Sequence, residues 1–343
     1  MLAPVGSLGD HPVVPFLTDI FFGLIALFYL LAVTTLVGTA AFHFLVWQRT
    51  SLPRGPVRAA AEEQVSKLVI TCGLWSSAAL LLLAGPRAVG VASLLDDRYT
   101  LSRRMVTLVL RSGWGLGLGA ILLAAAVSFL GYIGVGKRQA WGWPLVIFGV
   151  VLVAFGAGVQ GHPQDVFAEL TLAPLFDGLH TVSTGAWLGA FFLLVLAERR
   201  LPAHTASPWT DPLGAMLERY FSASGSLSAL VVLTGLFSAT THLTGMDDIG
   251  MTPYGRVLRG KVGIIVILMV VNEFHRRHAE RKARTSERPQ LVHSLRLQAG
   301  LICIILALTA VLLDTSPPGA NEVRSDVFRA VPMGSVQRDD VRP

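Results

Sequence analysis

The sequence predicts an all-α fold: a polytopic membrane helix bundle with about eight transmembrane helices. The first indication is composition, because 52% of the 343 residues are hydrophobic and only 15% are charged, against about 25% charged residues in soluble domains. The second is that apolar runs of about 20 residues, long enough to cross a bilayer, recur eight times. We expect spans at about residues 17–47, 66–90, 112–135, 142–160, 174–197, 221–243, 257–275 and 297–314.

These runs leave too little chain between them for a sizeable soluble domain, so residues 1–314 are expected to form one transmembrane domain. The first run is too long, and lacks a preceding positive residue, to be a cleavable signal peptide. The third is rich in glycine, which permits close helix contact. After Thr315 the chain contains Pro, Gly and charge without apolar periodicity. Residues 315–343 are therefore expected to form an extended tail.

Lysine and arginine predict the orientation, since cytoplasmic loops carry an excess of both. They follow the first, third, fifth and seventh spans, at Arg49, Arg54, Arg58, Lys137, Arg138, Arg199, Arg200 and the run from Arg276 to Arg288. Odd-numbered loops are therefore predicted to be cytoplasmic and both termini to lie on the outer, periplasmic side. The loop after the second span runs against this rule, with Arg87, Arg98, Arg103 and Arg104 expected outside. The net charge of +6 then reflects anchoring at the bilayer and not nucleic-acid binding.

Three histidines, His162, His180 and His242, fall at ends of predicted spans that open onto the same outer side. Carboxylates and thioethers accompany them in the sequence, among them Asp177 and Met246. Imidazole, carboxylate and thioether together are typical of a site that receives a cation or a metal ion. We therefore predict a metal site made by His162, His180, His242, Asp177 and Met246.

His180 lies about two turns into the fifth span. Helical spacing places Asp177, His180, Thr184 and Trp187 on one face. An aspartate three residues before a histidine can accept the ring N–H that is not used for a ligand, as carboxylates do in metal sites. The alternative interpretation is a structural histidine that bonds to a neighbouring helix.

Copper is the metal that suits these groups best, because imidazole binds copper and methionine favours Cu(I). Zinc would leave the methionines unexplained. The alternative cofactor is haem b, with His180 and either His162 or His242 as axial ligands, although histidines are supplied at one depth only. His275 and His293 belong to the basic loop and are expected to be solvated. No Ser-His-Asp arrangement, phosphate loop or HExxH helix is present, so no enzymatic activity is predicted.

The sequence also resembles a known family in several short motifs that follow one another in order. They are Gly161-His162, Asp177-Gly-Leu-His180, Trp187-Leu-Gly189, Leu233-Thr-Gly235-Leu, Thr252-Pro-Tyr-Gly-Arg256 with Lys261, Leu295-Arg-Leu297, Ala307-Leu-Thr-Ala310 and Pro317-Pro318. Together they resemble the copper resistance protein D (CopD) family over residues 155–318. The first four spans are similar mainly in hydropathy and number.

The resemblance implies an eight-helix protein of the bacterial inner membrane that handles copper from the periplasmic side, for uptake or delivery. By position it makes His162 and His180 candidates for a copper site, whereas His242 comes from topology alone. Gln298 departs from the pattern, since such proteins often have an acidic residue in the last span. Without a fused copper-binding domain in the sequence, copper would arrive from a separate periplasmic carrier.

Three functions remain open at this point: copper handling, electron transfer through haem b, and an accessory structural subunit of a larger membrane complex. The sequence shows no continuous line of polar residues through the spans, with Thr71, Cys72 and Asn272 as the few candidates. A simple channel is therefore not the leading prediction.

Overall fold

The computed structural model describes residues 13–95, 107, 109–161, 172–201, 211–243, 245, 247–282 and 288–314. Throughout this part of the chain the regular structure is helical and no strand occurs, which confirms the predicted all-α class. The predicted tail, residues 315–343, lies outside the described residues. The helices in chain order are α1 (Val13–Ala41), α2 (Pro56–Leu95), α4 (Gly113–Gly136), α5 (Gly142–Gly161), α6 (Ala173–Thr184), α7 (Ala190–Arg200), α8 (Pro212–His242), α9 (Asp248–Met251), α10 (Pro253–Lys282) and α11 (Arg288–Asp314).

Two short π-helical segments interrupt this pattern. The first, η2 (Phe42–Trp47), continues α1, and the second, η3 (Gly185–Gly189), joins α6 to α7. The α6–η3–α7 unit is therefore one continuous membrane-crossing rod with a wider turn at its centre. Such π-turns shift the faces of the two flanking α-helical parts relative to one another.

Seven helical segments in the described part of the chain are long and apolar enough to cross a membrane, so the protein is a multi-pass membrane protein. The eighth expected span, residues 257–275, lies within α10 and does not meet the same criterion. Between Lys261 and Glu273 only residues 262–272 are free of charge, fewer than the roughly 20 that a bilayer requires. The prediction of eight spans, like the orientation of the termini, is therefore not confirmed.

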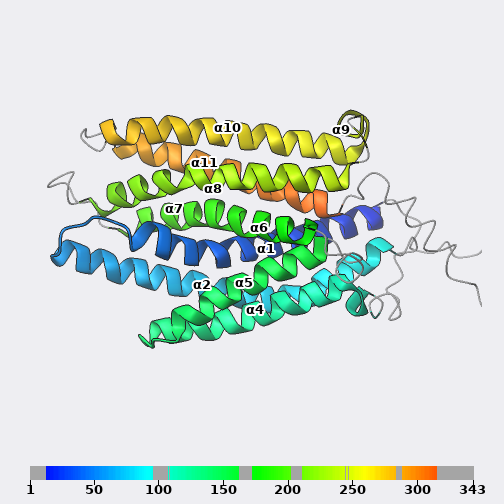
Figure 1. Cartoon of the computed structure of the whole chain (residues 1–343), viewed down its shortest axis with the longest axis horizontal. Helices are drawn as coiled ribbons and strands as arrows, with labels where there is room; N and C mark the ends of the chain where they lie inside the picture. The colour runs from blue at the N-terminus through cyan, green and yellow to red at the C-terminus, as the bar shows by residue number, and fades with distance from the viewer. Residues whose placement is uncertain are drawn as a thin grey trace, which may run out of the picture.

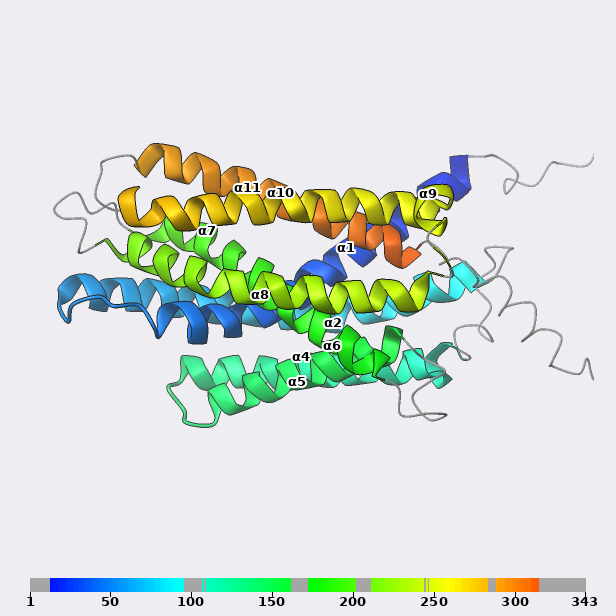
Figure 2. The same ribbon diagram turned by 45° about the horizontal axis from the view of Figure 1, so that its top comes forward.

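The helices run side by side along the long axis of the molecule (Figure 1). α1 lies in the interior, in contact with α2, η3, α7 and α11, while α4 and α5 form a pair on one side and α10 and α11 a pair on the other. The turned view in Figure 2 shows the same two pairs on opposite sides. α6 packs between α5 and α8, and this interface holds the candidate site.

Close backbone contact fixes η3 against α1. A side chain added at Gly38 of α1 would overlap the backbone of Gly189, and one added at Gly185 would come within 2.7 Å of the Val37 side chain. Glycines at these positions let the two helices approach closely, as small residues do in membrane helix pairs. Many large apolar side chains elsewhere face outward, such as Trp75 and Leu82, which are 74% and 76% exposed. This outer surface is suited to lipid.

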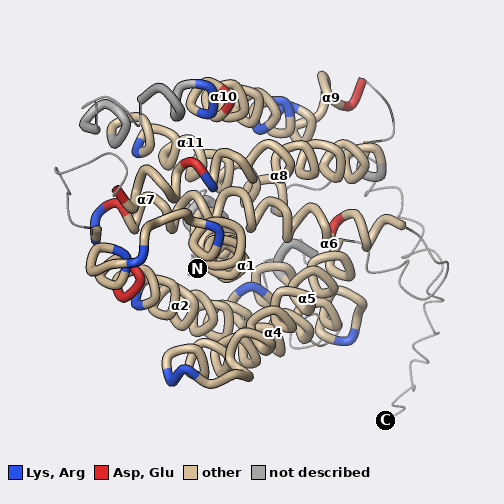
Figure 3. Tube along the Cα trace, turned by 60° about the vertical axis from the view of Figure 1, so that its left-hand side comes forward, with Lys and Arg blue, Asp and Glu red and all other residues tan. Residues whose placement is uncertain are grey.

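One end of the bundle carries most of the positive charge, as Figure 3 shows with this end turned forward. We call it the basic end; its members are Arg49, Arg54, Arg58, Lys137, Arg138, Arg199, Arg200, Arg276 and Arg277. The opposite end, where α5 ends and α6 begins, is the His180 end. Arg87 was expected in an outer loop, and this was wrong: α2 continues through Pro86 to Leu95 and buries Arg87 to 5% exposure.

Candidate functional site

His180 sits in the interface between α6 and α8, near the His180 end. Its Nδ1 lies 3.2 Å from the carbonyl oxygen of Val231 and 3.1 Å from the hydroxyl oxygen of Thr234. Both partners belong to α8 and both are buried. Close packing holds the ring in place, since a Cβ added at Gly235 would come within 2.9 Å of its Cε1 atom.

These partners fix the protonation pattern of the neutral imidazole. The Val231 carbonyl can only accept a hydrogen bond, and the Thr234 hydroxyl donates its own proton to the Leu230 carbonyl at 2.7 Å. Nδ1 must therefore carry the hydrogen and donate it, which leaves the lone pair on Nε2. No hydrogen bond to Nε2 is found among the described residues. This is the arrangement of a metal-binding histidine whose second nitrogen donates to a carbonyl oxygen.

Asp177 lies one helical turn before His180 but is not its partner, so the predicted pairing of these two side chains was wrong. The Ser238 hydroxyl of α8 donates a hydrogen bond to the Asp177 carboxylate. Thr234 and Ser238 are one turn apart on α8, as His180 and Asp177 are on α6. The prediction that Asp177 and His180 share a face of the helix is thereby confirmed. Stacking of Phe176 on Phe237, with ring centroids 4.1 Å apart, closes the same interface.

The end of α5 also reaches Asp177. A side chain added at Gly161, the last residue of α5, would overlap the Asp177 carboxylate. His162 is the next residue in the chain and lies outside the described residues. The carboxylate therefore lies against the residue that precedes His162 in the sequence.

His242 is the last residue of α8, and its backbone is described although its side chain is not. Positions 234, 238 and 242 are successive at a spacing of four, so they share one face of α8. Thr234 and Ser238 of this face contact His180 and Asp177. Met246 lies outside the described residues. Among those that are described, no group of three or more His, Cys, Asp or Glu gathers as a metal cluster, so the five-residue ligand set stays a prediction.

Two residues of α10 complete the surroundings of the site. Lys261 and His180 lie close enough to interact electrostatically, as do Tyr254 and Asp177. One cation of α10 and one carboxylate of α6 therefore lie near the imidazole. α6 and α8 form the candidate site, and α10, which packs on α8, lies beside it.

The Thr252-Pro-Tyr-Gly-Arg256 motif has a structural explanation. The Thr252 hydroxyl accepts the Gly255 N–H at 3.0 Å, which caps the start of α10. A side chain at Gly255 would overlap the Asp248 carbonyl, so glycine allows α9 to fold back on α10. Arg256 is exposed, and no ion pair joins it to Asp177 among the described residues. The motif shapes the corner next to the site.

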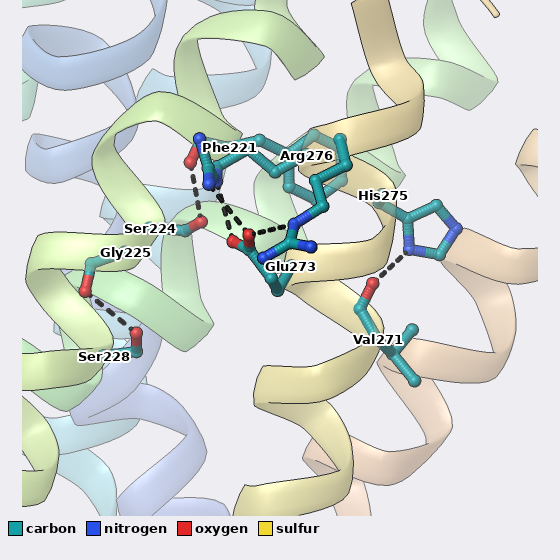
Figure 4. Close-up of polar contacts among 9 residues, drawn as sticks. Phe221, Ser224, Gly225, Ser228, Val271, Glu273, His275 and Arg276 are labelled. Carbon is teal, nitrogen blue, oxygen red and sulfur yellow. Dashed lines mark hydrogen bonds and ion pairs between the residues drawn. The ribbon is translucent and has the colours of Figure 1, made fainter.

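His275, expected to be solvated, is instead half-buried between α10 and α11 near the basic end. Figure 4 shows its ring turned from α10 toward α11, with Nδ1 2.8 Å from the carbonyl oxygen of Val271. Ser294 and Gln298 of α11 each lie 2.8 Å from the ring nitrogens. The prediction failed because Arg276 and Arg277 follow His275 directly and suggested a loop. His293 is exposed, as expected.

Fold and site define a polytopic membrane protein that holds a histidine of fixed tautomer between two helices near one end of the bundle. The family model described as Copper resistance protein D matches residues 214–312. The chain is also 26% identical over 211 residues, 59% of its length, to the copper transport protein CutJ of Bacillus subtilis (strain 168). These matches confirm the resemblance of this multi-pass membrane protein to the copper resistance protein D family, which the family model carries over residues 214–312.

Both matches cover only part of the proteins compared. The chain spans 37% of the length of CutJ. The family match includes His242 and Met246 but begins after His162 and His180. No solved structure matches the chain.

Proposed function

We propose that the protein handles copper without acting as an enzyme, binding the ion through His180 at the His180 end of the bundle. The observation that supports this most directly is the hydrogen bonding of Nδ1 to two acceptors, which leaves the Nε2 lone pair for a ligand. A purely structural histidine would be expected to use both nitrogens, as His275 does. The relation to copper resistance protein D makes copper the preferred metal.

His162, His242, Asp177 and Met246 are the proposed further ligands. Gly161 lies against Asp177, and His242 shares the α8 face that contacts α6. Histidine with methionine suits Cu(I), and histidine with a carboxylate suits Cu(II). The set therefore offers a place for copper in either state.

By the positive-inside rule the basic end is cytoplasmic and the His180 end periplasmic. We infer a location in the bacterial inner membrane, with eight spans and both termini outside. Copper would be received from a periplasmic carrier, and taken inward or delivered to a partner in a larger membrane complex.

Metal analysis and a visible spectrum of the purified protein test this proposal. The wild type is compared with the double variant His162→Ala/His180→Ala and with the matched control His293→Ala, which removes an exposed histidine near the basic end. We expect stoichiometric copper in the wild type and the control, and loss of copper in the double variant. A Soret band would instead indicate haem b, and equal copper in all three would refute the site.

A further inference from the structure

Four buried polar atoms along the α6–η3, α10 and α11 interfaces have no hydrogen-bond partner among the described residues. They are Thr184 Oγ1, Trp187 Nε1, Asn272 Oδ1 and Gln298 Oε1. Leaving such an atom unpaired in a protein interior is costly, so buried polar groups are nearly always bonded to protein or to water. Buried water is the usual partner of such atoms.

The first of these polar groups lie along α6 and η3, starting from the candidate site. His180 and Thr184 are four residues apart on α6 and share one face, and Trp187 follows three residues later in the π-turn η3. From His180 to Trp187 the rod advances by about 10 Å. Trp187 is almost fully buried, at 1% exposure, and lies in the π-turn η3 near the centre of the rod.

Tyr220 of α8 connects to the polar groups of α6 and η3 through a hydrogen bond. Its hydroxyl donates to the Trp187 carbonyl at 3.2 Å, and its side chain is 2% exposed. The Asn272 side chain of α10 is also buried and lies near the same hydroxyl. Polar groups of three helices therefore meet at the middle of the bundle.

The last part reaches the basic end. His275 follows Asn272 by one turn of α10, and its ring contacts Ser294 and Gln298 of α11. Figure 4 shows the ring on the opposite side of α10 from Glu273 and Arg276. The exposed side chains of Arg276 and Arg277 follow directly in sequence. Hydroxyl, indole, phenol, amide and imidazole groups thus run from the His180 end to the basic end; we call this series the buried polar line.

We propose that the buried polar line, filled in by water, conducts protons across the bundle between the His180 end and the basic end. This goes beyond copper binding and needs no copper ion. The groups at its centre are a threonine hydroxyl, an indole N–H, a phenol and an amide, which bond to water but are poor copper ligands. A chain of hydrogen bonds requires only single water molecules between its members, whereas a copper ion would require further soft ligands along the way.

Proton flux into liposomes that contain the purified protein tests the proposal. A pH-sensitive dye is enclosed, a potassium diffusion potential drives the flux, and the buffer is free of copper. We expect the wild type to acidify or alkalinise the interior according to the sign of the potential. Absence of flux above protein-free liposomes would overturn the proposal, and would leave copper binding, which is measured separately, unaffected.

Two variants interrupt the line at different helices. Thr184→Val keeps the shape of the side chain and removes one hydroxyl, and Asn272→Leu removes the amide between Tyr220 and His275. Each is expected to lower the flux by about tenfold or more, the effect of losing one transition-state hydrogen bond. Ser228→Ala is the matched control, because this hydroxyl is also buried but bonds only within α8.

The control should conduct like the wild type. Two results would contradict the assignment of the buried polar line: an unchanged proton flux in Thr184→Val, or a flux in Ser228→Ala that falls as much as in Thr184→Val. Elution of each variant as a single folded species is checked before reconstitution. If Asn272→Leu does not fold, Thr184→Val alone decides the question.

Discussion

Replacing Thr234 with valine should weaken copper binding at His180 while leaving the fold intact. Thr234 is 1% exposed, and its hydroxyl oxygen accepts from His180 Nδ1 at 3.1 Å. Valine has nearly the same shape but cannot accept that bond, so only the Val231 carbonyl at 3.2 Å still orients the ring. We expect unfolding to become easier by about 0.6–1 kcal/mol, the usual value of one such bond.

The effect on copper is expected to be larger than the effect on stability. Loss of a group that orients a metal-binding histidine typically costs 10–100-fold in affinity, and one of the two acceptors is kept. We therefore predict a loss of about tenfold, or about 1.4 kcal/mol. Competition with a chelator of known copper affinity measures it in purified protein.

Thr240→Val is the matched control for this experiment. Thr240 lies on the same helix and its hydroxyl donates to the Phe237 carbonyl at 2.7 Å, but it is exposed and does not touch His180. Copper affinity should equal that of the wild type. If Thr234→Val bound copper as tightly as the wild type, or if both variants lost affinity equally, the reasoning about the His180 tautomer would be refuted.

Two glycine substitutions test the packing around the site. Gly235→Ala places a methyl group 2.9 Å from the His180 ring. Copper affinity should fall, and the protein should lose about 1–3 kcal/mol of stability, as an overpacked core does, which lowers the melting temperature. Unchanged copper affinity and melting temperature would contradict the contact. Gly38→Ala should destabilise the protein at least as much, because the methyl group would overlap the Gly189 backbone. The control is Gly23→Ala on the same helix, whose methyl group would meet nothing within 4 Å. This control should be neutral or stabilising. Thermal unfolding in detergent compares the two, and equal effects would argue against close α1–η3 packing.

The membrane-spanning helices could be predicted because a long apolar run has one stable solution in a bilayer, a helix that satisfies its own backbone. Their ends were less predictable. The second span was expected from residue 66, yet α2 begins at Pro56, because charged residues such as Glu63 and Lys67 form a favourable i,i+4 pair at 2.6 Å and extend the helix.

The partners of the site residues could not be predicted, since they belong to a different helix. Sequence spacing correctly placed Asp177 and His180 on one face, but which residues of α8 meet that face depends on how the two helices pack. Val231 carried no signal of its own, being one apolar residue in a long span, and Thr234 belonged to the Leu233-Thr-Gly235-Leu motif without any indication of its contact with His180. The motif containing Gly235 marked the right region without indicating its contact with the His180 ring.

The buried polar line was missed for the same reason. Its members come from four helices, so no single span looks polar, and Asn272 was the one member recognised in the sequence as a candidate. Gln298 stood out as a departure from the family pattern, and the structure gives it a partner, His275.

X-ray absorption at the copper edge tests the central claim most directly, because it reports the atoms bound to the metal. The copper-loaded wild type and the His180→Ala variant are compared at equal copper content, with His293→Ala as the reference. We predict imidazole scattering in the wild type and the reference, and its reduction in His180→Ala. A His180→Ala spectrum identical to that of the wild type, or copper without any imidazole ligand, would contradict the account.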